Sequence, residues 1–395
     1  MNLELPPILV VIAVATLAPY LASHVKVVRI PVVVLEIVLG ILIGPHVLGW
    51  GEIAGSLPYL SVMGTGFLFF IAGAEVDLRA LQGPPLRRGI LGWIISLALA
   101  GGAAFVLWHT GFTSAWAVVL VALTTTALGV LIPILRDNGE LDSSFGRFVA
   151  ACGVLGEIGP ILVMSVLLSQ AHTAGMQAAL TVLFIAIAVG ICWLSLKIRP
   201  PGLIGLLGRT MNQSGQLPMR MCLLLLAVLA ITAEKLGLDL ALGAFTAGMA
   251  VGLATRDNPS HVLQDKLDAV GFGFVIPIFF VCSGIKLDLP ALLSLDAVAK
   301  MMVYLVALLL VRGLPALLFY RLLGGRDCLA LALYSATSLS LIVVITGAAV
   351  ERNLMPSAEA APLVGAGLLS VLLFPSIVGL LRGQHAVAYD GRDSL

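Results

Sequence analysis

The feature that most constrains this chain is a series of apolar runs, each about 20 residues long, separated by short charged or Pro/Gly-rich breaks. A helix of that length spans the hydrocarbon core of a bilayer. Of the 395 residues, 60% are hydrophobic and 11% are charged, whereas a soluble domain carries about 25% charged residues. The sequence therefore predicts an all-α polytopic membrane protein. We expect about thirteen transmembrane helices, at 6–24, 30–48, 59–77, 88–108, 115–135, 147–170, 175–196, 217–236, 238–255, 268–286, 297–320, 327–350 and 359–382.

The distribution of Lys and Arg predicts how these helices are oriented, because cytoplasmic loops keep most of the basic residues. With the N-terminus outside, thirteen spans leave only Lys235, Lys286, Lys300 and Arg352 in external loops. We therefore expect a multi-pass protein of the cell (inner or plasma) membrane with its N-terminus outside and its C-terminus in the cytoplasm. The net charge of +1 gives no reason to expect a nucleic-acid partner.

Short motifs recur between the two halves of the chain. The recurring pairs are Gly73-x3-Asp77-Leu78 with Gly284-x3-Asp288-Leu289, and Gly40-x3-Gly44 with Gly248-x3-Gly252. Equivalent spans are seven apart, so the second copy crosses the membrane in the opposite direction. We expect two inverted-topology repeats, at 1–170 and 217–382, with a linker helix and cytoplasmic loop at 171–216 and a short cytoplasmic tail at 383–395. A chance match of two short apolar motifs is the alternative.

Glu157 and Arg312 each lie alone in the middle of an apolar run. A charge at the bilayer centre costs about 2.5–3.5 kcal/mol on insertion scales, and it is usually retained because it binds, pairs or transfers a proton. The neighbouring Gly156, Gly159 and Pro160 predict an interrupted helix that leaves room and free carbonyls beside the carboxylate. The alternative is a Glu157–Arg312 ion pair that only holds helices together.

Hydroxyl side chains cluster in the fifth and twelfth runs, which are equivalent in the predicted repeat. An inverted pair of broken helices would cross there and offer hydroxyl and carbonyl oxygens to a hard cation. The alternative is that each hydroxyl bonds its own backbone or a neighbouring helix. Glu36, early in the second run, is either a residue of the proton path or a packing residue. The clustered residues are Thr124, Thr125 and Thr126 in one run and Ser335, Thr337 and Ser338 in the other.

Four motifs together resemble the monovalent cation:proton antiporter superfamily, in its sodium/hydrogen exchanger domain and its potassium-efflux/antiporter-2 branch, over essentially the whole chain. This resemblance implies thirteen helices with crossed broken helices, a homodimer, a panel domain plus a core domain, and elevator-like movement of the ion site. The motifs are Pro31-x4-Glu36-x3-Gly40-x3-Gly44-Pro45, Gly73-Ala-Glu-Val-Asp77, Leu242-Gly-Ala-Phe-Thr-Ala-Gly248 and Pro277-Ile-Phe-Phe.

The resemblance also implies roles for the two membrane charges. In the family the cation site is an aspartate, often preceded by Asp, Asn or Gln, on the helix that matches the sixth run, and here that pair reads Gly156-Glu157. The basic residue of the family's core matches Arg312. Our hypothesis is a secondary transporter that exchanges a monovalent cation, Na⁺ or K⁺, for H⁺ by alternating access, with Glu157 holding the proton or the cation in turn. With one carboxylate and a permanently charged Arg312, the simplest cycle exchanges one cation for one proton and is electrically silent.

The sequence carries none of the common enzyme signatures. We therefore expect no enzyme activity, no cofactor and no metal other than a transported monovalent cation at Glu157. The expected partners are the cation, the proton, membrane lipid and a second copy of the chain. Two other functions stay open: a sodium-coupled organic-anion carrier in which Arg312 binds the substrate, and a non-transporting membrane sensor or assembly subunit.

Overall fold

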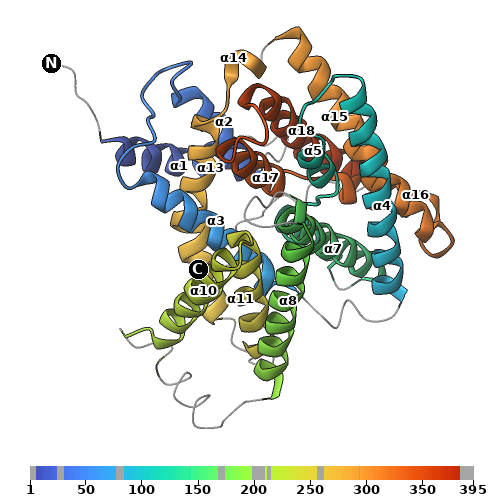
Figure 1. Cartoon of the computed structure of the whole chain (residues 1–395), viewed down its shortest axis with the longest axis horizontal. Helices are drawn as coiled ribbons and strands as arrows, with labels where there is room; N and C mark the ends of the chain where they lie inside the picture. Colours follow the sequence, from blue (N-terminus) through green and yellow to red (C-terminus); the bar gives the residue numbers. More distant parts are fainter. Residues whose placement is uncertain are drawn as a thin grey trace.

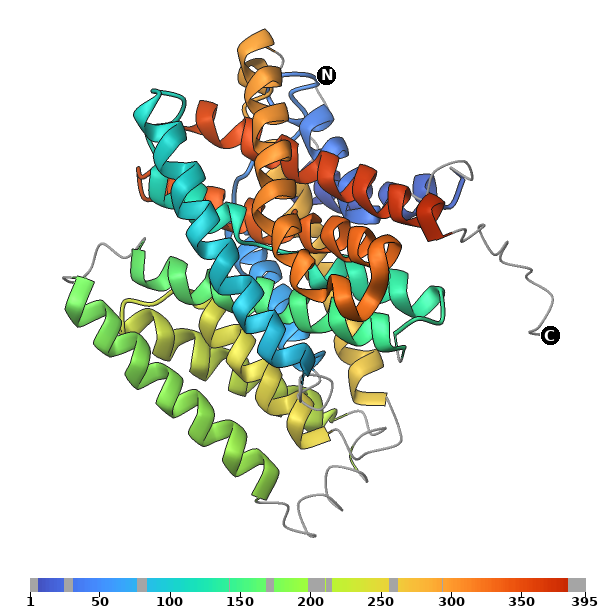
Figure 2. The ribbon, with the colours of Figure 1, turned by 90° about the vertical axis from the view of Figure 1, so that its right-hand side faces the viewer.

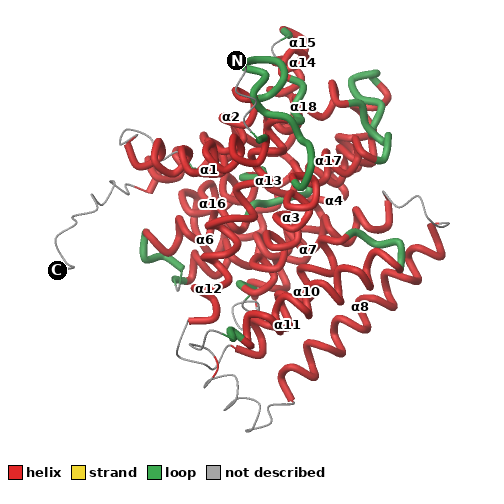
Figure 3. The backbone as a smooth tube through the Cα atoms, turned by 90° about the vertical axis from the view of Figure 1, so that its left-hand side faces the viewer, coloured by secondary structure: helices red, strands yellow, loops and turns green. Residues whose placement is uncertain are grey.

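The computed structural model describes residues 6–24, 31–76, 84–141, 143–167, 174–197, 210, 215–255, 262–292 and 294–382. Within these ranges the chain consists of helices joined by turns and loops, without a strand (Figure 3). The helices of the first half are α1 (Pro7–His24), α2 (Val32–Ile43), α3 (Leu57–Ala74), α4 (Pro84–His109), α5 (Trp116–Leu123), α6 (Leu128–Asp137), α7 (Ser144–Leu167) and α8 (Ala174–Lys197).

The helices of the second half include two irregular turns, the π-helical η1 (Gly271–Val275) and the 3₁₀-helical η2 (Leu314–Phe319). In the described ranges, eight helices are long and apolar enough to cross a membrane. The number of crossings stays a prediction, and the predicted tail at 383–395 lies outside the described residues. The α-helices of this half are α10 (Leu217–Lys235), α11 (Leu240–Thr255), α12 (Val262–Val270), α13 (Ile276–Ile285), α14 (Leu289–Leu292), α15 (Leu295–Gly313), α16 (Tyr320–Ala336), α17 (Ser340–Glu351) and α18 (Ser357–Arg382).

One group of helices is built on two close pairs, α3 against α11 and α2 against α13. Glycine makes both approaches close, because the Cα of Gly248 lies against the carbonyl oxygen of Phe70 and that of Gly284 lies against the carbonyl oxygen of Ile37. A side chain at either glycine would run into backbone atoms, and small residues of this kind are typical of membrane helix interfaces. We call this group, α1–α3 with α10–α13, the panel body.

A second group of helices contains the pairs α4 against α7 and α15 against α18, together with α5, α6, α16 and α17. We call α4–α7 with α15–α18 the core body. In Figure 1 the core helices α4, α15 and α16 lie at the right, away from α1, α2 and α13 of the panel body. Helix α8, bright green in Figure 2, packs against α11 of the panel body and α7 of the core body.

The helix pairings fit the predicted inverted repeat. In that repeat the second and third runs correspond to the ninth and tenth, so the pair α2–α13 corresponds to the pair α11–α3. In the same way, α4–α7 corresponds to α15–α18. When each helix is replaced by its equivalent in the other repeat, one observed helix pair becomes another observed helix pair. This is the packing that an inverted repeat predicts. The repeat boundaries and the four-part division of the chain stay predictions.

Two broken helices meet at the centre of the core body. Residues 124–127 separate α5 from α6, and residues 337–339 separate α16 from α17. The backbone N–H of Ala127 donates to the carbonyl of Thr337 at 2.8 Å, so the two non-helical segments lie side by side. The expectation that the fifth and twelfth runs break and cross at their hydroxyl clusters is confirmed.

Helix α7 does not follow the sequence expectation. It is continuous through Gly156, Gly159 and Pro160, so the prediction of an interrupted helix around Glu157 is wrong. The glycines serve close packing instead: a Cβ at Gly159 would run into the indole ring of Trp93 on α4. Sequence alone does not separate a glycine that breaks a helix from a glycine that admits a neighbouring side chain.

Candidate functional site

Glu157 lies on α7 beside the crossing of the broken helices and is 5% exposed. The backbone N–H groups of Leu128 and Gly129 favour its ionised carboxylate. These residues begin α6, so the carboxylate lies at the positive end of that helix dipole. In the described part of the chain, the Oε2 atom of Glu157 has no hydrogen-bond partner. A buried oxygen without a partner is costly, and a bound proton or cation would satisfy it.

Arg312, near the end of α15, is 4% exposed and does not pair with Glu157. Its Nε and Nη2 donate to the hydroxyl of Thr126 at 3.1 and 2.7 Å, its Nη1 donates to the hydroxyl of Ser96 at 3.2 Å, and its Nη2 also donates to the carbonyl of Cys152 at 3.1 Å. Both charged residues are described, and no ion pair joins them. The alternative of a structural Glu157–Arg312 ion pair is therefore wrong for this conformation. Arg312 instead connects α15 to α4, α7 and the crossing.

Gly156 allows Arg312 to reach Thr126. A Cβ at Gly156 would lie 2.5 Å from the hydroxyl oxygen of Thr126 and 2.6 Å from Nη2 of Arg312. The carbonyl of Gly156 accepts the backbone N–H of Thr126 at 2.9 Å. The position before Glu157 is therefore occupied by the side chains of two neighbours, and this packing has no room for a second carboxylate at that position.

The two hydroxyl clusters come together at the crossing. The hydroxyl of Thr126 donates to the carbonyl of Ser335 at 2.5 Å, and the hydroxyls of Thr125 and Ser338 are in hydrogen-bond contact. These contacts join α5 and α6 to α16 and α17. The structure buries all six predicted residues, namely Thr124, Thr125, Thr126, Ser335, Thr337 and Ser338.

Three hydroxyls of the clusters bond their own chain segment. Thr124 donates to the carbonyl of Val121 at 2.7 Å, Thr125 donates to the carbonyl of Ala122 at 2.6 Å, and Thr337 donates to the carbonyl of Leu333 at 3.0 Å. This is the alternative role that the sequence left open for such residues. Their carbonyls and hydroxyl lone pairs still lie in the non-helical segments, so their place in a cation site stays a prediction.

Ser370 supports the crossing, although the sequence analysis did not select it. Its hydroxyl accepts a hydrogen bond from the backbone N–H of Ser338 at 3.0 Å and donates one to the carbonyl of Ser338 at 2.9 Å. Ser370 thereby ties α18 to the break between α16 and α17. The only available signal was a hydroxyl within an apolar run.

Glu75 is a second acidic residue at the site, and the sequence prediction did not include it. It forms the C-cap of α3 in the panel body, and its charge interacts with the carboxylate of Glu157. The motif Gly73-Ala-Glu-Val-Asp77 contains it, so the motif gave a usable signal. Asp77 lies outside the described residues.

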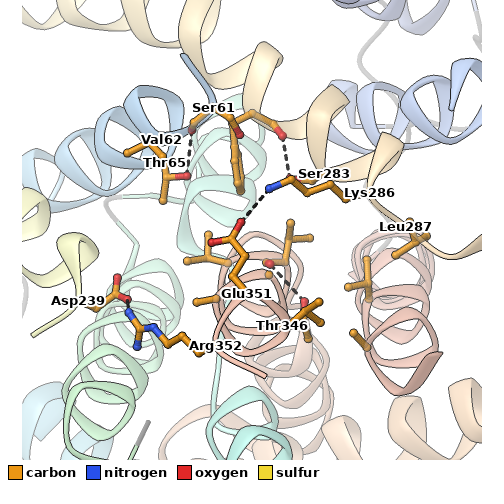
Figure 4. Close-up of a pocket in the computed structure, with 18 of the residues that line it drawn as sticks. Ser61, Val62, Thr65, Asp239, Ser283, Lys286, Leu287, Thr346, Glu351 and Arg352 are labelled. Atoms are coloured by element: carbon orange, nitrogen blue, oxygen red, sulfur yellow. Dashed lines mark hydrogen bonds and ion pairs between the residues drawn. The ribbon is translucent and has the colours of Figure 1, made fainter. Parts of the chain in front are cut away.

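A cavity of about 500 Å³ lies between the two bodies, with α2, α3 and α13 on one side and α17 and α18 on the other (Figure 4). More acidic than basic side chains line it, which favours cations. Ile37 on α2 lines the cavity. Its neighbour in the sequence, Glu36, is 3% exposed on the panel body and lies away from the crossing. Glu157 is not among the described residues that line the cavity, so its carboxylate is closed off from this cavity in this conformation.

A comparison with known protein families shows to which family the chain belongs. The profile of the sodium/hydrogen exchanger, transmembrane, matches residues 12–381. The chain belongs to the sodium/hydrogen exchanger family. Membership confirms the resemblance found in the motifs and the multi-pass membrane architecture.

Two curated relatives and one solved structure are similar to this chain. YjbQ of Bacillus subtilis is 29% identical over 360 residues, which cover 85% of this chain and 56% of YjbQ, so the chain spans little more than half of that relative. GerN of Bacillus cereus, named a Na⁺/H⁺-K⁺ antiporter, is 24% identical over 367 residues, covering 88% of this chain and 89% of GerN. The sodium proton antiporter MjNhaP1 of Methanocaldococcus jannaschii has the same fold, with a TM-score of 0.63, 18% identity, and coverage of 96% of this chain and 99% of that one.

Proposed function

We propose that this protein exchanges Na⁺ or K⁺ for protons by alternating access, with Glu157 as the carboxylate that holds a proton and a cation in turn. The observation that carries the proposal is the unpartnered, buried Oε2 atom of Glu157 beside two crossed broken helices. The names of GerN and MjNhaP1 support cation:proton antiport as the activity. Neither name decides between Na⁺ and K⁺ for this chain.

The coupling follows from the cost of a bare charge in the membrane. A carboxylate that carries a proton or a monovalent cation is neutral, whereas a free carboxylate is expensive to move through the hydrocarbon layer. The N–H groups of Leu128 and Gly129 stabilise the ionised carboxylate, and Oε2 receives the proton or the cation. The hydroxyl and carbonyl oxygens of the crossing supply the remaining cation ligands. The core body then moves only when Glu157 is loaded, which links the two fluxes.

Arg312 acts as a fixed counter-charge in this proposal. Its guanidinium nitrogens all donate to oxygen atoms of Thr126, Ser96 and Cys152. The organic-anion alternative requires those donors to be free for a substrate, so the geometry favours cation exchange. Glu75 adds negative charge from the panel body and attracts the cation toward Glu157.

The remaining predictions belong to the same proposal. The homodimer, the contact with cell-membrane lipid, the external N-terminus and the cytoplasmic C-terminus are proposed from the resemblance and from the Lys and Arg distribution. Glu36 is proposed as a proton-path residue because it is a buried acid and the next residue in the chain, Ile37, lines the cavity. No cofactor has a role in the cycle.

The test is cation-driven fluorescence dequenching in proteoliposomes that hold a proton gradient. Na⁺, K⁺ and Li⁺ are added in turn, with the membrane potential clamped or free. The proposal predicts that Na⁺ or K⁺ dissipates the gradient. If no cation does so, the non-transporting sensor or subunit is favoured. If a carboxylated solute is needed and drives sodium uptake, the organic-anion carrier is favoured.

A further inference from the structure

Two ion pairs connect the panel body to the core body at the cavity (Figure 4). Nζ of Lys286 lies 2.8 Å from Oε1 of Glu351, and Nη2 of Arg352 lies 3.0 Å from Oδ2 of Asp239. Lys286 and Asp239 belong to the panel body, whereas Glu351 and Arg352 belong to the core body. Each pair therefore crosses from one body to the other.

Three further ion pairs between described residues stay within the core body. Lys300 pairs with Asp296 inside α15, and Arg382 on α18 pairs with Glu140 and Asp327. The two bridging pairs thus lie where the bodies face each other, at the lining of the cavity between them. This placement distinguishes them from ion pairs that hold one body together.

The bridging residues are fixed at the ends of their helices. Oδ1 of Asp239 accepts the backbone N–H of Ala241, which caps the start of α11, and Oδ2 takes Arg352. Arg352 caps the C-terminus of α17, and Lys286 caps the C-terminus of α13. An acid at a helix start and a base at a helix end are each favoured by the helix dipole. The partners are therefore held in position by their own bodies before they meet.

Helix α17 connects these pairs to the ion site. Its 12 residues begin at Ser340, directly after the break at 337–339, and end at Glu351. At about 1.5 Å per residue the helix is about 18 Å long. A displacement of the crossing therefore moves Glu351 and Arg352 relative to the panel body.

We propose that the Lys286–Glu351 and Asp239–Arg352 pairs form a latch that holds the two bodies together on this face and opens once in every transport cycle. The inference rests on the alternating-access movement of the proposed function. Partly exposed ion pairs are weak, so each changes a conformational equilibrium by about two- to fivefold. That is enough to bias the conformation and weak enough to release it during each cycle.

A reversible crosslink tests whether the latch has to open. Lys286→Cys is combined with Glu351→Cys, and the purified, reconstituted protein is treated with a short bis-methanethiosulfonate that a reductant removes. The latch predicts at least a tenfold loss of exchange on crosslinking and full recovery on reduction. Each single cysteine variant, treated in the same way, controls for reaction with the native cysteines. Mass spectrometry establishes that the bridge has formed.

Charge exchange tests the same pair without a covalent bond. Lys286→Glu and Glu351→Lys each place like charges together, and each is expected to change the exchange rate or the apparent cation affinity by about two- to fivefold. The double variant restores the opposite charges, so its values return toward those of the unmodified protein. Lys300→Glu and Asp296→Lys, singly and combined, are the matched control, because that pair lies within α15. The rate of cation exchange is expected to stay unchanged in all of these control variants.

The outcomes separate the latch from the proposed function. Cation exchange at the normal rate in fully crosslinked protein overturns the latch. The latch is also overturned if the charge-exchanged double variant recovers neither the exchange rate nor the cation affinity of the unmodified protein. A bridge that fails to form in folded protein also contradicts it, because the two side chains would not meet. Absence of exchange from the unmodified protein and the reduced variant would instead contradict the proposed function.

Discussion

At the scale of single residues, the site separates a fixed positive charge from a carboxylate that can be loaded. The backbone N–H groups that start α6 favour the ionised Glu157 carboxylate, and its Oε2 has no hydrogen-bond partner among the described residues. Arg312 lies close enough to Gly156 to exclude a Cβ there, and its donors are already engaged. In the proposed cycle, Glu157 therefore exchanges a proton for a cation without breaking an ion pair.

Gly156→Ala tests this separation. The new methyl group would lie 2.5 Å from the hydroxyl of Thr126 and 2.6 Å from Nη2 of Arg312, so the Arg312–Thr126 contacts must shift. We expect a loss of about 1–3 kcal/mol in stability and at least a tenfold loss of exchange, measured by thermal unfolding and by flux in proteoliposomes. Gly190→Ala on α8, where a Cβ meets no atom within 4 Å, is the control. Full exchange by Gly156→Ala would show that the position of Arg312 is unimportant.

The residue scale also shows what the sequence could reveal of the site. Glu157 and Arg312 stood out because each is a lone charge in an apolar run. The contact between Arg312 and Thr126 joins residues that are far apart in the chain, and no local pattern encodes it. The motif Gly73-Ala-Glu-Val-Asp77 contains Glu75, but the interaction of its charge with Glu157 depends on how the panel and core bodies are placed together.

At the scale of helices, the crossing of α5–α6 with α16–α17 was predictable because both hydroxyl clusters fall in equivalent runs. The continuity of α7 was not, because glycine and proline in a membrane helix permit either a break or a close neighbour. The side chain of Trp93 against Gly159 decided between the two. The role of Ser370 was likewise hidden, because it depends on where α18 lies.

Ser370→Ala tests the support of the crossing. Removing the hydroxyl leaves the buried N–H and carbonyl of Ser338 without that partner, which costs about 1–3 kcal/mol. We expect a lower unfolding temperature and reduced exchange. Ser376→Ala on the same helix is the comparison, because that exposed hydroxyl donates only to the carbonyl of Leu372 within α18. If the two variants have the same unfolding temperature and the same exchange rate, Ser370 does not support the crossing.

Gly248→Ala tests the packing of the panel body. The added Cβ would run into the carbonyl oxygen of Phe70 and push α11 away from α3. The expected destabilisation is about 1–3 kcal/mol, seen as a lower unfolding temperature in detergent. Gly66→Ala on α3 is the control, because its nearest neighbour, Leu240 Cδ2, would lie at an ordinary 3.6 Å. A Gly248→Ala protein as stable as the control would contradict the close pairing of these helices.

At the scale of the whole molecule, two helical bodies face each other across a cavity of about 500 Å³. The lengths of the apolar runs predicted the membrane class and most helix positions, because span length is set by bilayer thickness. The pairing of helices into two bodies, and the cavity between them, depend on contacts between distant segments. The sequence suggested them only through the repeat and the family resemblance.

Electrical silence is the prediction that belongs to this scale. One carboxylate exchanges one cation for one proton while Arg312 keeps its charge, so a full cycle moves no net charge. We expect the same exchange rate with the membrane potential clamped at zero and at a large negative value, measured in proteoliposomes. A rate that follows the potential would show that a second titratable group takes part in the cycle, and Glu75, whose charge acts on Glu157, is a candidate.

In the proposed cycle the same carboxylate, that of Glu157, holds the proton and the cation. The most direct test of this proposal is the release of protons when a saturating concentration of the transported cation is added to purified protein in weakly buffered detergent solution. We predict about one proton released per chain from the unmodified protein and none from Glu157→Gln, with the fold of the variant verified by its unfolding temperature. Undiminished proton release from folded Glu157→Gln would contradict the account.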